Sequence, residues 1–358
     1  MEIGIIGLPE SGKTTTFNAL VKGKVETQAT RSLEPNIGVA KVKDPRLLGL
    51  EALLKPKRTV YAEVKYVDIP IPWSRGGFSG QLLTYLSEVD ALIHVVRAFE
   101  DERIPHIEGS VDPERDIAIM NLELAFSDLA IIERRLERIE DSLRKAKPSE
   151  RQALLQEQTL LTKIKSGLEG EVPVREQGLR EEEAKLIENY QFLTAKPLLV
   201  ALNIGEEQLP QAFSFEAKLH SGYPQFLIAA ICSKLEMELA QLSEAEAEEF
   251  RLALGIKEPL ADRIIRLSLE ALGQIAFFTT ASSEVKAWTV RKNTLAPKAA
   301  GKIHSDMERG FIRAEVINYN ELVKCGSLAE ARKRGLVRLE GKSYPVQDGD
   351  VITFLFSV

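Results

Sequence analysis

The chain has 358 residues, of which 44% are hydrophobic and 28% charged, as is typical of a soluble globular protein with two or three domains. A formal net charge of −6 excludes a basic field over the whole molecule, and no apolar run is long enough to span a membrane. The two distant cysteines, Cys232 and Cys325, exclude a disulfide framework and a CxxC zinc site. Because the first residues lack the order of a signal peptide, we expect a cytoplasmic protein.

A phosphate-binding loop is the first predicted feature, because residues 7–14 read G-x-x-x-x-G-K-T between an apolar strand at 3–6 and a helix at 14–20. Glycines let the backbone curl so that its N–H groups and the helix N-terminus bind anionic phosphates. We expect Lys13 to reach the β- and γ-phosphates as a catalytic group, and the Thr14 hydroxyl to ligate Mg²⁺. The residues predicted to surround the phosphates are Gly7, Leu8, Pro9, Glu10, Ser11, Gly12, Lys13, Thr14 and Thr15.

Four further segments predict strands of a parallel sheet. They are "VYAEVKYVDIP", "ALIHVVRAF", "KPLLVALNIG" and "QFLIAAICSK". Strands that alternate with helices indicate a doubly wound α/β fold, in which ligands bind beyond the carboxyl ends of the strands. Gly7, Asp68, Asn203 and Cys232 lie at such ends, so we expect one site to collect them.

An insertion of different character separates "ALIHVVRAF" from "KPLLVALNIG". Its leucines recur every seven residues with isoleucines between them, and charged residues fill the other faces, which predicts a coiled-coil seam. Pro148 interrupts this seam, and a second helical stripe follows. The first stripe consists of Leu122, Leu129, Ile132, Leu136, Ile139 and Leu143, and the second of Leu154, Leu161, Ile164 and Leu168. We expect an antiparallel helical hairpin that projects into solvent, with two ordinary core helices as the alternative.

The composition changes again from about residue 276. Residues 276–358 contain 13 Lys and Arg against 9 Asp and Glu, and their pattern predicts a small mixed sheet with a helix or two. A basic module joined to an acidic body suggests a surface that faces a polyanion, and a merely solvated surface is the alternative.

The phosphate loop also needs a metal-anchoring acid and a base-reading loop. Asp68 is placed to hold Mg²⁺ through a water, and Ser32, with Thr30 next, could supply a hydroxyl that closes over the metal. Guanine readers have the form Asn-Lys-x-Asp, whereas this chain offers Asn203 and Glu206 without that Lys and Asp. An Asn amide pairs well with adenine N6 and N7. The chemistry favours ATP, and GTP remains the alternative.

The motifs "GIIGLPESGKTTTFNAL", "LEPNIGVAKVKDPRL", "HIEGSVDPERDI", "KPLLVALNIGEE" and "FFTTASSEVKAWTVRKNTLAPKAAGKIHSDMERGFIRAEV" together resemble the YchF/Obg-like ATPase family over essentially the whole chain. This family lies in the translation-factor-related class of P-loop GTPase-like proteins. The resemblance implies a preference for ATP, association with ribosomes and a catalytic histidine at His106. It also places the base beside Asn203, Ile204, Glu206, Cys232 and Ser233.

Some residues depart from the pattern of the family. Glu10 stands where relatives usually have Asn, so the monovalent cation (K⁺) linked to that Asn is in doubt. Asp68 is followed by Ile69, Pro70 and Ile71 without the usual glycine, and Ser32 replaces a threonine. Nucleotide binding should survive these changes, and triggered hydrolysis is what they put in question.

The resulting expectation is an α/β P-loop NTPase with an inserted coiled-coil hairpin and a C-terminal TGS-type, ubiquitin-like α+β domain. The nucleotide-binding domain would span residues 1–120 and 192–275, the hairpin 121–191 and the C-terminal domain 276–358. We expect a slow, Mg²⁺-dependent ATPase, monomeric and bound to ribosome or RNA, with no membrane partner and no sequence-specific DNA binding. The alternatives are a GTPase, a nucleotide-gated binding module that hydrolyses poorly, and a P-loop kinase of small molecules.

Overall fold

The computed structural model describes residues 1–23, 34–69, 78, 80–281 and 283–357. The chain divides into two compact units, one of residues 1–38 and 65–264 and the other of residues 39–64 and 265–358. The segment 39–64, which the sequence analysis counted with the nucleotide-binding domain, therefore groups with the C-terminal region.

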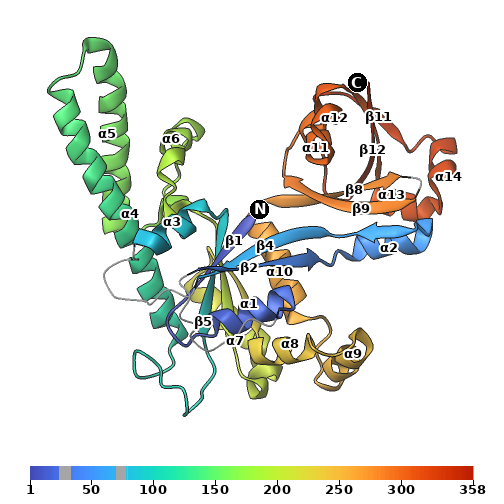
Figure 1. The fold of residues 1–358 in the computed structure, drawn as a ribbon, viewed down its shortest axis with the longest axis horizontal. Helices are drawn as coiled ribbons and strands as arrows, with labels where there is room; N and C mark the ends of the chain where they lie inside the picture. Colours follow the sequence, from blue (N-terminus) through green and yellow to red (C-terminus); the bar gives the residue numbers. More distant parts are fainter. Residues whose placement is uncertain (24–33, 70–77, 79, 282, 358) are drawn as a thin grey trace. The chain divides into compact units, whose positions relative to one another are not determined.

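A six-stranded sheet in the order β2-β4-β1-β5-β6-β7 carries the predicted phosphate-binding loop (Figure 1). The pairs β1–β4, β1–β5, β5–β6 and β6–β7 are parallel, which confirms the predicted sheet. Every residue of β5 and β6 is buried, which explains why their sequences are nearly continuous apolar runs. The strands are β1 (Glu2–Ile6), β2 (Asn36–Val42), β4 (Ala62–Asp68), β5 (Ala91–Arg97), β6 (Leu198–Asn203) and β7 (Leu227–Ile231).

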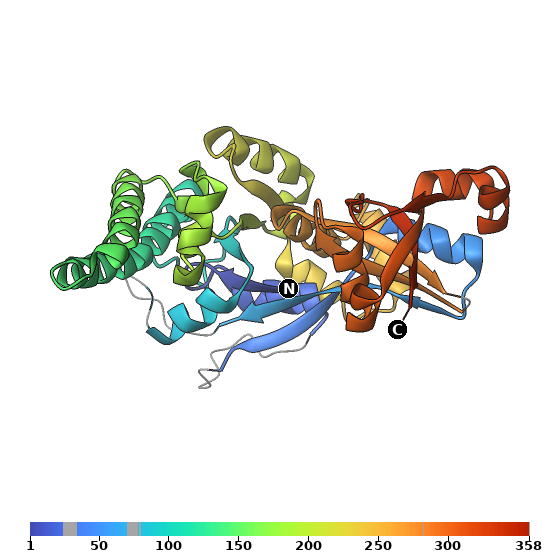
Figure 2. The same ribbon diagram turned by 90° about the horizontal axis from the view of Figure 1, so that it is seen from above.

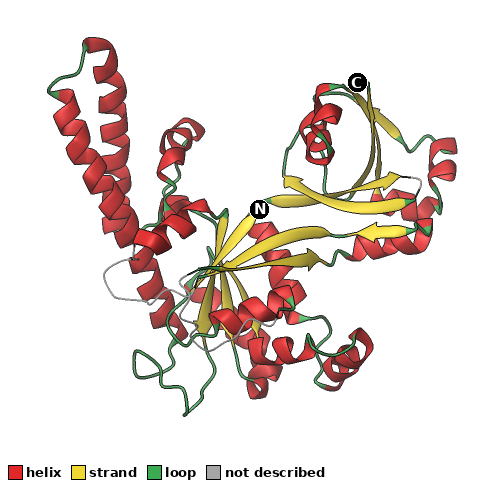
Figure 3. Cartoon of the chain, in the orientation of Figure 1, coloured by secondary structure: helices red, strands yellow, loops and turns green. Residues whose placement is uncertain are grey.

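Helices follow the strands, as the colouring by secondary structure shows (Figure 3). Leu86, Met120 and Leu219 come from three different helices and share one buried cluster with Leu92 and Leu202 of the sheet. Apart from α4, described next, the helices that follow these strands include α1 (Lys13–Val21), α3 (Gly80–Glu88), α7 (Ala212–Gly222), α8 (Ser233–Leu239), α9 (Glu244–Ala253) and α10 (Leu260–Ala271), and the short turn η4 (Glu206–Gln211) follows β6.

Two long antiparallel helices, α4 (Pro113–Leu143) and α5 (Pro148–Glu169), lie side by side and form the predicted hairpin (Figures 1 and 2). Helix α4 begins at a strong signal, because the Asp112 side chain accepts from the Arg115 N–H and Pro113 occupies the first helical position. Pro148 likewise opens α5, as expected for the residue that interrupts the first stripe. The chain returns to β6 through η1 (Val174–Glu176), α6 (Glu181–Ile187), η2 (Glu188–Tyr190) and η3 (Leu193–Ala195).

The seam of the hairpin differs from the predicted one at its first position. Ile132, Ile139, Leu161 and Ile164 are fully buried in a cluster of their own, whereas Leu122 is 37% exposed. The seam starts instead at the small, buried Ala125 and continues through Leu129, Ile132, Leu136, Ile139 and Leu143. The first three turns of α4 pack on the sheet through Ile117, Met120 and Leu124, so the heptad cannot extend back to Leu122.

The second unit contains a six-stranded sheet in the order β11-β10-β12-β8-β9-β3. Strand β3 (Arg58–Val60) comes from the early segment and pairs in parallel with β9 (Glu284–Arg291). In the same unit Arg46 of α2 (Pro45–Leu54) donates to both carboxylate oxygens of Asp348 at 2.7 and 3.1 Å. The other elements are β8 (Gln274–Ala281), α11 (Ala296–Ile303), α12 (Ser305–Arg309), β10 (Phe311–Asn318), α13 (Tyr319–Cys325), α14 (Leu328–Lys333), β11 (Arg338–Glu340) and β12 (Asp350–Phe356).

No helix within the described ranges combines the length and the apolar character that a membrane span requires.

Candidate nucleotide-binding site

The loop between β1 and α1 adopts a conformation that only certain residues tolerate. Gly7 and Gly12 have φ angles of 155° and 92°, and a Cβ on either would collide, with the Val95 carbonyl in the first case and with the Asn203 amide in the second. Glu10 also has a positive φ of 58°, which disfavours a residue with a Cβ, and its side chain is exposed. The glycines therefore allow the backbone to pass close to two neighbouring strands.

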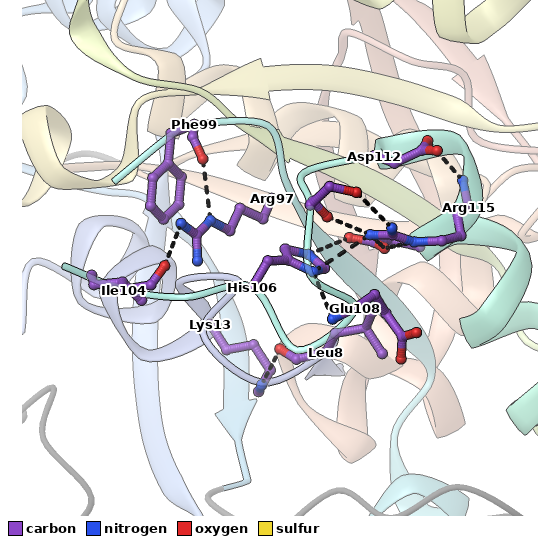
Figure 4. Close-up of polar contacts among 11 residues, drawn as sticks. Leu8, Lys13, Arg97, Phe99, Ile104, His106, Glu108, Asp112 and Arg115 are labelled. Carbon is purple, nitrogen blue, oxygen red and sulfur yellow. Dashed lines mark hydrogen bonds and ion pairs between the residues drawn. The ribbon is translucent and has the colours of Figure 1, made fainter. Parts of the chain in front are cut away.

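Lys13 begins α1 and folds back over the loop. Its Nζ donates to the carbonyl oxygens of Gly7 and Leu8 at 3.1 and 2.9 Å (Figure 4). Desolvation lowers the pKa of this ammonium, and the carboxylates of Asp68 and Glu10 oppose that shift. The cation is thus held by neutral carbonyls, which an anionic phosphate can replace as stronger partners.

The two predicted metal ligands with described coordinates lie together. The Thr14 hydroxyl donates to Asp68 Oδ2 at 2.8 Å, and the Asn36 amide donates to the same oxygen at 3.1 Å. Asp68 is 1% exposed at the carboxyl end of β4. A hydroxyl and a carboxylate in contact beside a phosphate loop suit Mg²⁺, which takes few protein ligands and keeps waters and phosphate oxygens. Ser32, Thr30 and Ile71 lie outside the described residues.

The predicted base-reading corner is joined to the phosphate loop by one amide. Asn203, at the end of β6, donates from Nδ2 to the Ser11 carbonyl at 2.9 Å and accepts from the Ser233 N–H at 3.1 Å. The Ser233 hydroxyl in turn lies 2.7 Å from that of Thr16 in α1. Asn203 therefore links β6, the phosphate loop and α8, and one N–H of its NH₂ group has no role in these bonds.

The other residues predicted to surround the base and the phosphates range from buried to exposed. Glu206 is exposed at the start of η4, after the buried Ile204 and a half-buried Gly205. Burial of the neighbouring Cys232 raises the pKa of its thiol to about 11, so the thiol is protonated at neutral pH. Thr15 and Pro9 are half-buried, and Leu8 is buried with 1% exposure.

His106 lies in the loop that follows β5, and it does not face the phosphate loop. Figure 4 shows its ring turned toward Arg115 rather than toward Lys13. Its Nε2 lies 2.8 Å from Asp116 Oδ2, and its Nδ1 accepts from the Glu108 N–H at 3.1 Å. The structure thus brings together the phosphate, metal and base corners and leaves this histidine engaged elsewhere.

Three side chains near the site were missed by the sequence analysis. They are Asn36 beside Asp68, Arg97 at the end of β5, and Asp116 in α4. Arg97 is 2% exposed and donates to the carbonyls of Phe99 and Ile104 at 3.1 and 2.8 Å. A charged residue that ends an apolar strand at the ligand-binding edge was the available signal for Arg97, whereas Asn36 and Asp116 have no local signal.

Comparisons with known proteins agree with this geometry. A family model described as "50S ribosome-binding GTPase" matches residues 2–122, and the YchF GTPase C-terminal model, described as a protein of unknown function (DUF933), matches residues 274–357. The chain is 40% identical to the ribosome-binding ATPase YchF of Bacillus subtilis (strain 168), over 99% of each protein. It is 34% identical to Obg-like ATPase 1 of Caenorhabditis elegans, over 100% of this chain and 92% of that protein.

A solved structure extends the likeness to three dimensions. The YchF GTPase of Schizosaccharomyces pombe superposes with a TM-score of 0.86 at 30% identity and covers 99% of this chain and 97% of its own. This match confirms the expected fold class, a P-loop domain with a helical hairpin and a C-terminal α/β domain. Full-length identity, both family models and this fold together show that the chain belongs to the YchF/Obg-like ATPase family.

Proposed function

We propose that this protein binds ATP with Mg²⁺, hydrolyses it slowly and uses the bound state to regulate its association with ribosomes. The observation that carries the proposal is the 2.8 Å contact between Thr14 Oγ1 and Asp68 Oδ2, which puts two Mg²⁺-type oxygens beside the Lys13 ammonium. Curated relatives with nearly full-length matches carry the name ribosome-binding ATPase, which supports the same assignment.

The residues of the phosphate loop would perform the binding. Lys13 would exchange the carbonyls of Gly7 and Leu8 for phosphate oxygens, and Thr14 and Asp68 would hold Mg²⁺, with Ser32 as a third expected ligand. The ion, when bound, neutralises charge that develops on the transferred phosphoryl group. The remaining chemistry is positioning and electrostatic stabilisation by fixed backbone N–H groups, without a covalent intermediate.

The base corner supports ATP over GTP. Asn203 keeps one N–H that could reach a purine N7, which both bases present, so this residue does not discriminate between them. Glu206 is one methylene longer than the aspartate of guanine readers and stands exposed at the start of η4. One oxygen of a mobile carboxylate is enough to accept from the adenine amino group, whereas guanine needs both oxygens of a carboxylate held fixed against its N1–H and amino group. Side-by-side calorimetric titration with ATP and GTP in Mg²⁺ tests this, and a clear preference for GTP would overturn it.

His106 is the residue we propose to orient the attacking water, in the absence of a glutamine at the usual position. The Lys13→Ala variant should lose nucleotide binding, because the phosphates lose their cation. The His106→Ala variant should keep binding while turnover falls about 10²-fold or more, the contribution of one general acid–base group. Equal turnover of parent and His106→Ala would remove this role.

A nucleotide-gated binding module that hydrolyses poorly is the second candidate. The observation that favours it is the engagement of both His106 nitrogens away from Lys13. In this case the output is ribosome binding by a cytoplasmic monomer, in which the hairpin and the C-terminal unit would make the contacts. Cosedimentation with ribosomes at low salt, with no nucleotide, ADP or a non-hydrolysable ATP analogue, tests it. Absence of cosedimentation in all three conditions would contradict both the gated module and the proposed regulator.

A further inference from the structure

Both ring nitrogens of His106 are already engaged by protein groups. Because the Glu108 N–H donates to Nδ1 at 3.1 Å, Nδ1 is an acceptor and the proton resides on Nε2, which donates to Asp116 at 2.8 Å. Arg115 Nη2 lies 3.4 Å from the same Nδ1. The side chains of His106 and Asp116 are only 3% and 2% exposed, so water does not compete for these bonds. A histidine in this arrangement cannot orient the attacking water.

The acceptor of this contact is anchored firmly. Asp116 lies in the first turn of α4, and its second oxygen, Oδ1, accepts from Nε and Nη2 of Arg115 at 3.1 and 2.8 Å. The next residues toward the sheet, Ile117 and Met120, are fully buried in the core. The same turn is tied to the end of α7, because the hydroxyl of Tyr223, the residue after that helix, donates to the Glu114 carbonyl at 3.2 Å. Asp116 is therefore the immobile partner.

The loop that bears His106 is attached much more loosely. Within the described stretch 99–112, no residue is buried as a whole, although the His106 side chain is only 3% exposed. Arg97 holds the first half of the loop through the Phe99 and Ile104 carbonyls. Gly109 follows the histidine with a φ of 82°, and among the described atoms none would lie within 4 Å of a Cβ added there. Arg115 also donates to the Ser110 carbonyl at 2.6 Å. Breaking the contact with Asp116 would therefore release the His106 ring without disturbing the core, while Ser110 keeps its bond to Arg115.

We propose that the Asp116 carboxylate, backed by Arg115, is a latch that holds His106 away from the bound phosphates, so that hydrolysis requires this latch to open. The proposal rests on the proposed role of His106 in hydrolysis. It assigns Asp116 a restraining role, opposite in sign to that of a carboxylate that orients a catalytic histidine. The two roles predict opposite effects of removing the carboxylate.

The test compares steady-state ATP turnover of the full chain with that of Asp116→Ala, His106→Ala and the double variant. A latch predicts that Asp116→Ala turns over about fivefold faster or more, the factor by which one hydrogen bond of ordinary strength biases an equilibrium. The gain should disappear in the double variant, and the KM for ATP should stay constant because no binding group changes. Asp101→Ala is the matched control, because this carboxylate lies in the same loop and bonds Arg103 instead of His106.

The outcomes separate the latch from the function on which it rests. Slower or unchanged turnover in a folded Asp116→Ala, or a gain that persists in the double variant, would overturn the latch. If His106→Ala instead leaves turnover unchanged, both in the parent chain and in the Asp116→Ala variant, then the histidine has no part in hydrolysis and the latch is excluded with it. Melting curves check folding. If Asp116→Ala does not fold, Arg115→Met replaces it; this change removes the bonds of the guanidinium to Asp116 and to Ser110 but keeps the carboxylate, so it should give a smaller gain.

Discussion

Asn203 is predicted to hold the nucleotide site together, and the Asn203→Ala variant measures how much. The change removes the bonds to the Ser11 carbonyl (2.9 Å) and from the Ser233 N–H (3.1 Å), both in residues with 2% exposure or less. Each of these two buried groups left without a partner costs about 1–3 kcal/mol, so the free energy of unfolding should fall by about 2–6 kcal/mol. ATP affinity should fall as well, because the phosphate loop loses its tie to β6.

The assay is chemical denaturation with and without ATP and Mg²⁺, together with a calorimetric titration of ATP. Gln208→Ala is the matched control, because this amide also makes two bonds to backbone, with Gly205 and Ala98, but none to the phosphate loop. Asn203→Asp should be at least as harmful as Asn203→Ala, since it places a carboxylate oxygen against the Ser11 carbonyl. If Asn203→Ala lost less than about 1 kcal/mol and bound ATP as the parent does, the reasoning would be refuted.

Three further predictions concern other parts of the chain. Glu10→Asn should raise the free energy of unfolding by about 0.5–1 kcal/mol, because Asn tolerates the positive φ better than Glu. The same change should strengthen ATP binding and make that binding more sensitive to K⁺, and unchanged melting and binding would contradict this prediction. Ile139→Ala should cost the hairpin about 2–5 kcal/mol and lower helical circular dichroism while ATP binding persists, with half-exposed Leu122→Ala as a mild control. Cys232 should resist alkylation at pH 8 in the folded protein, because burial raises the pKa of its thiol, whereas the partly exposed Cys325 should react. Mass spectrometry after brief labelling distinguishes the two cysteines, and equal labelling of both would contradict the prediction.

Local patterns were sufficient to predict most of the fold. The phosphate loop, the strands ending at Asp68 and Asn203, and the hairpin broken at Pro148 all follow from short-range spacing, and each lies where it was expected. The seam failed only at Leu122, because a heptad does not reveal where a helix leaves one core and enters another.

The candidate site was less accessible to such reasoning. The phosphate-loop motif predicted Thr14 and the end of a strand predicted Asp68 as metal ligands, and the two side chains are in contact. The partners of Asn203 and His106 depend on side-chain directions that no spacing encodes, since Ser11 lies 192 residues from Asn203. The sequence around Asp116 indicates only where a helix begins. Its bond to His106 depends on the path of the intervening loop, which the sequence pattern does not reveal.

The early segment 39–64 cannot complete its unit while the chain is still being synthesised. Leu47 and Leu50 of α2 are fully buried, yet their unit is completed by residues 265–358, which are synthesised much later than α2. Until then, β3 lacks β9 and Arg46 lacks Asp348, so an unfinished chain exposes an apolar helix face and an unpaired strand edge. Premature termination anywhere before β9 would therefore damage two distant stretches at once, and such fragments should be prone to aggregation and rapid degradation.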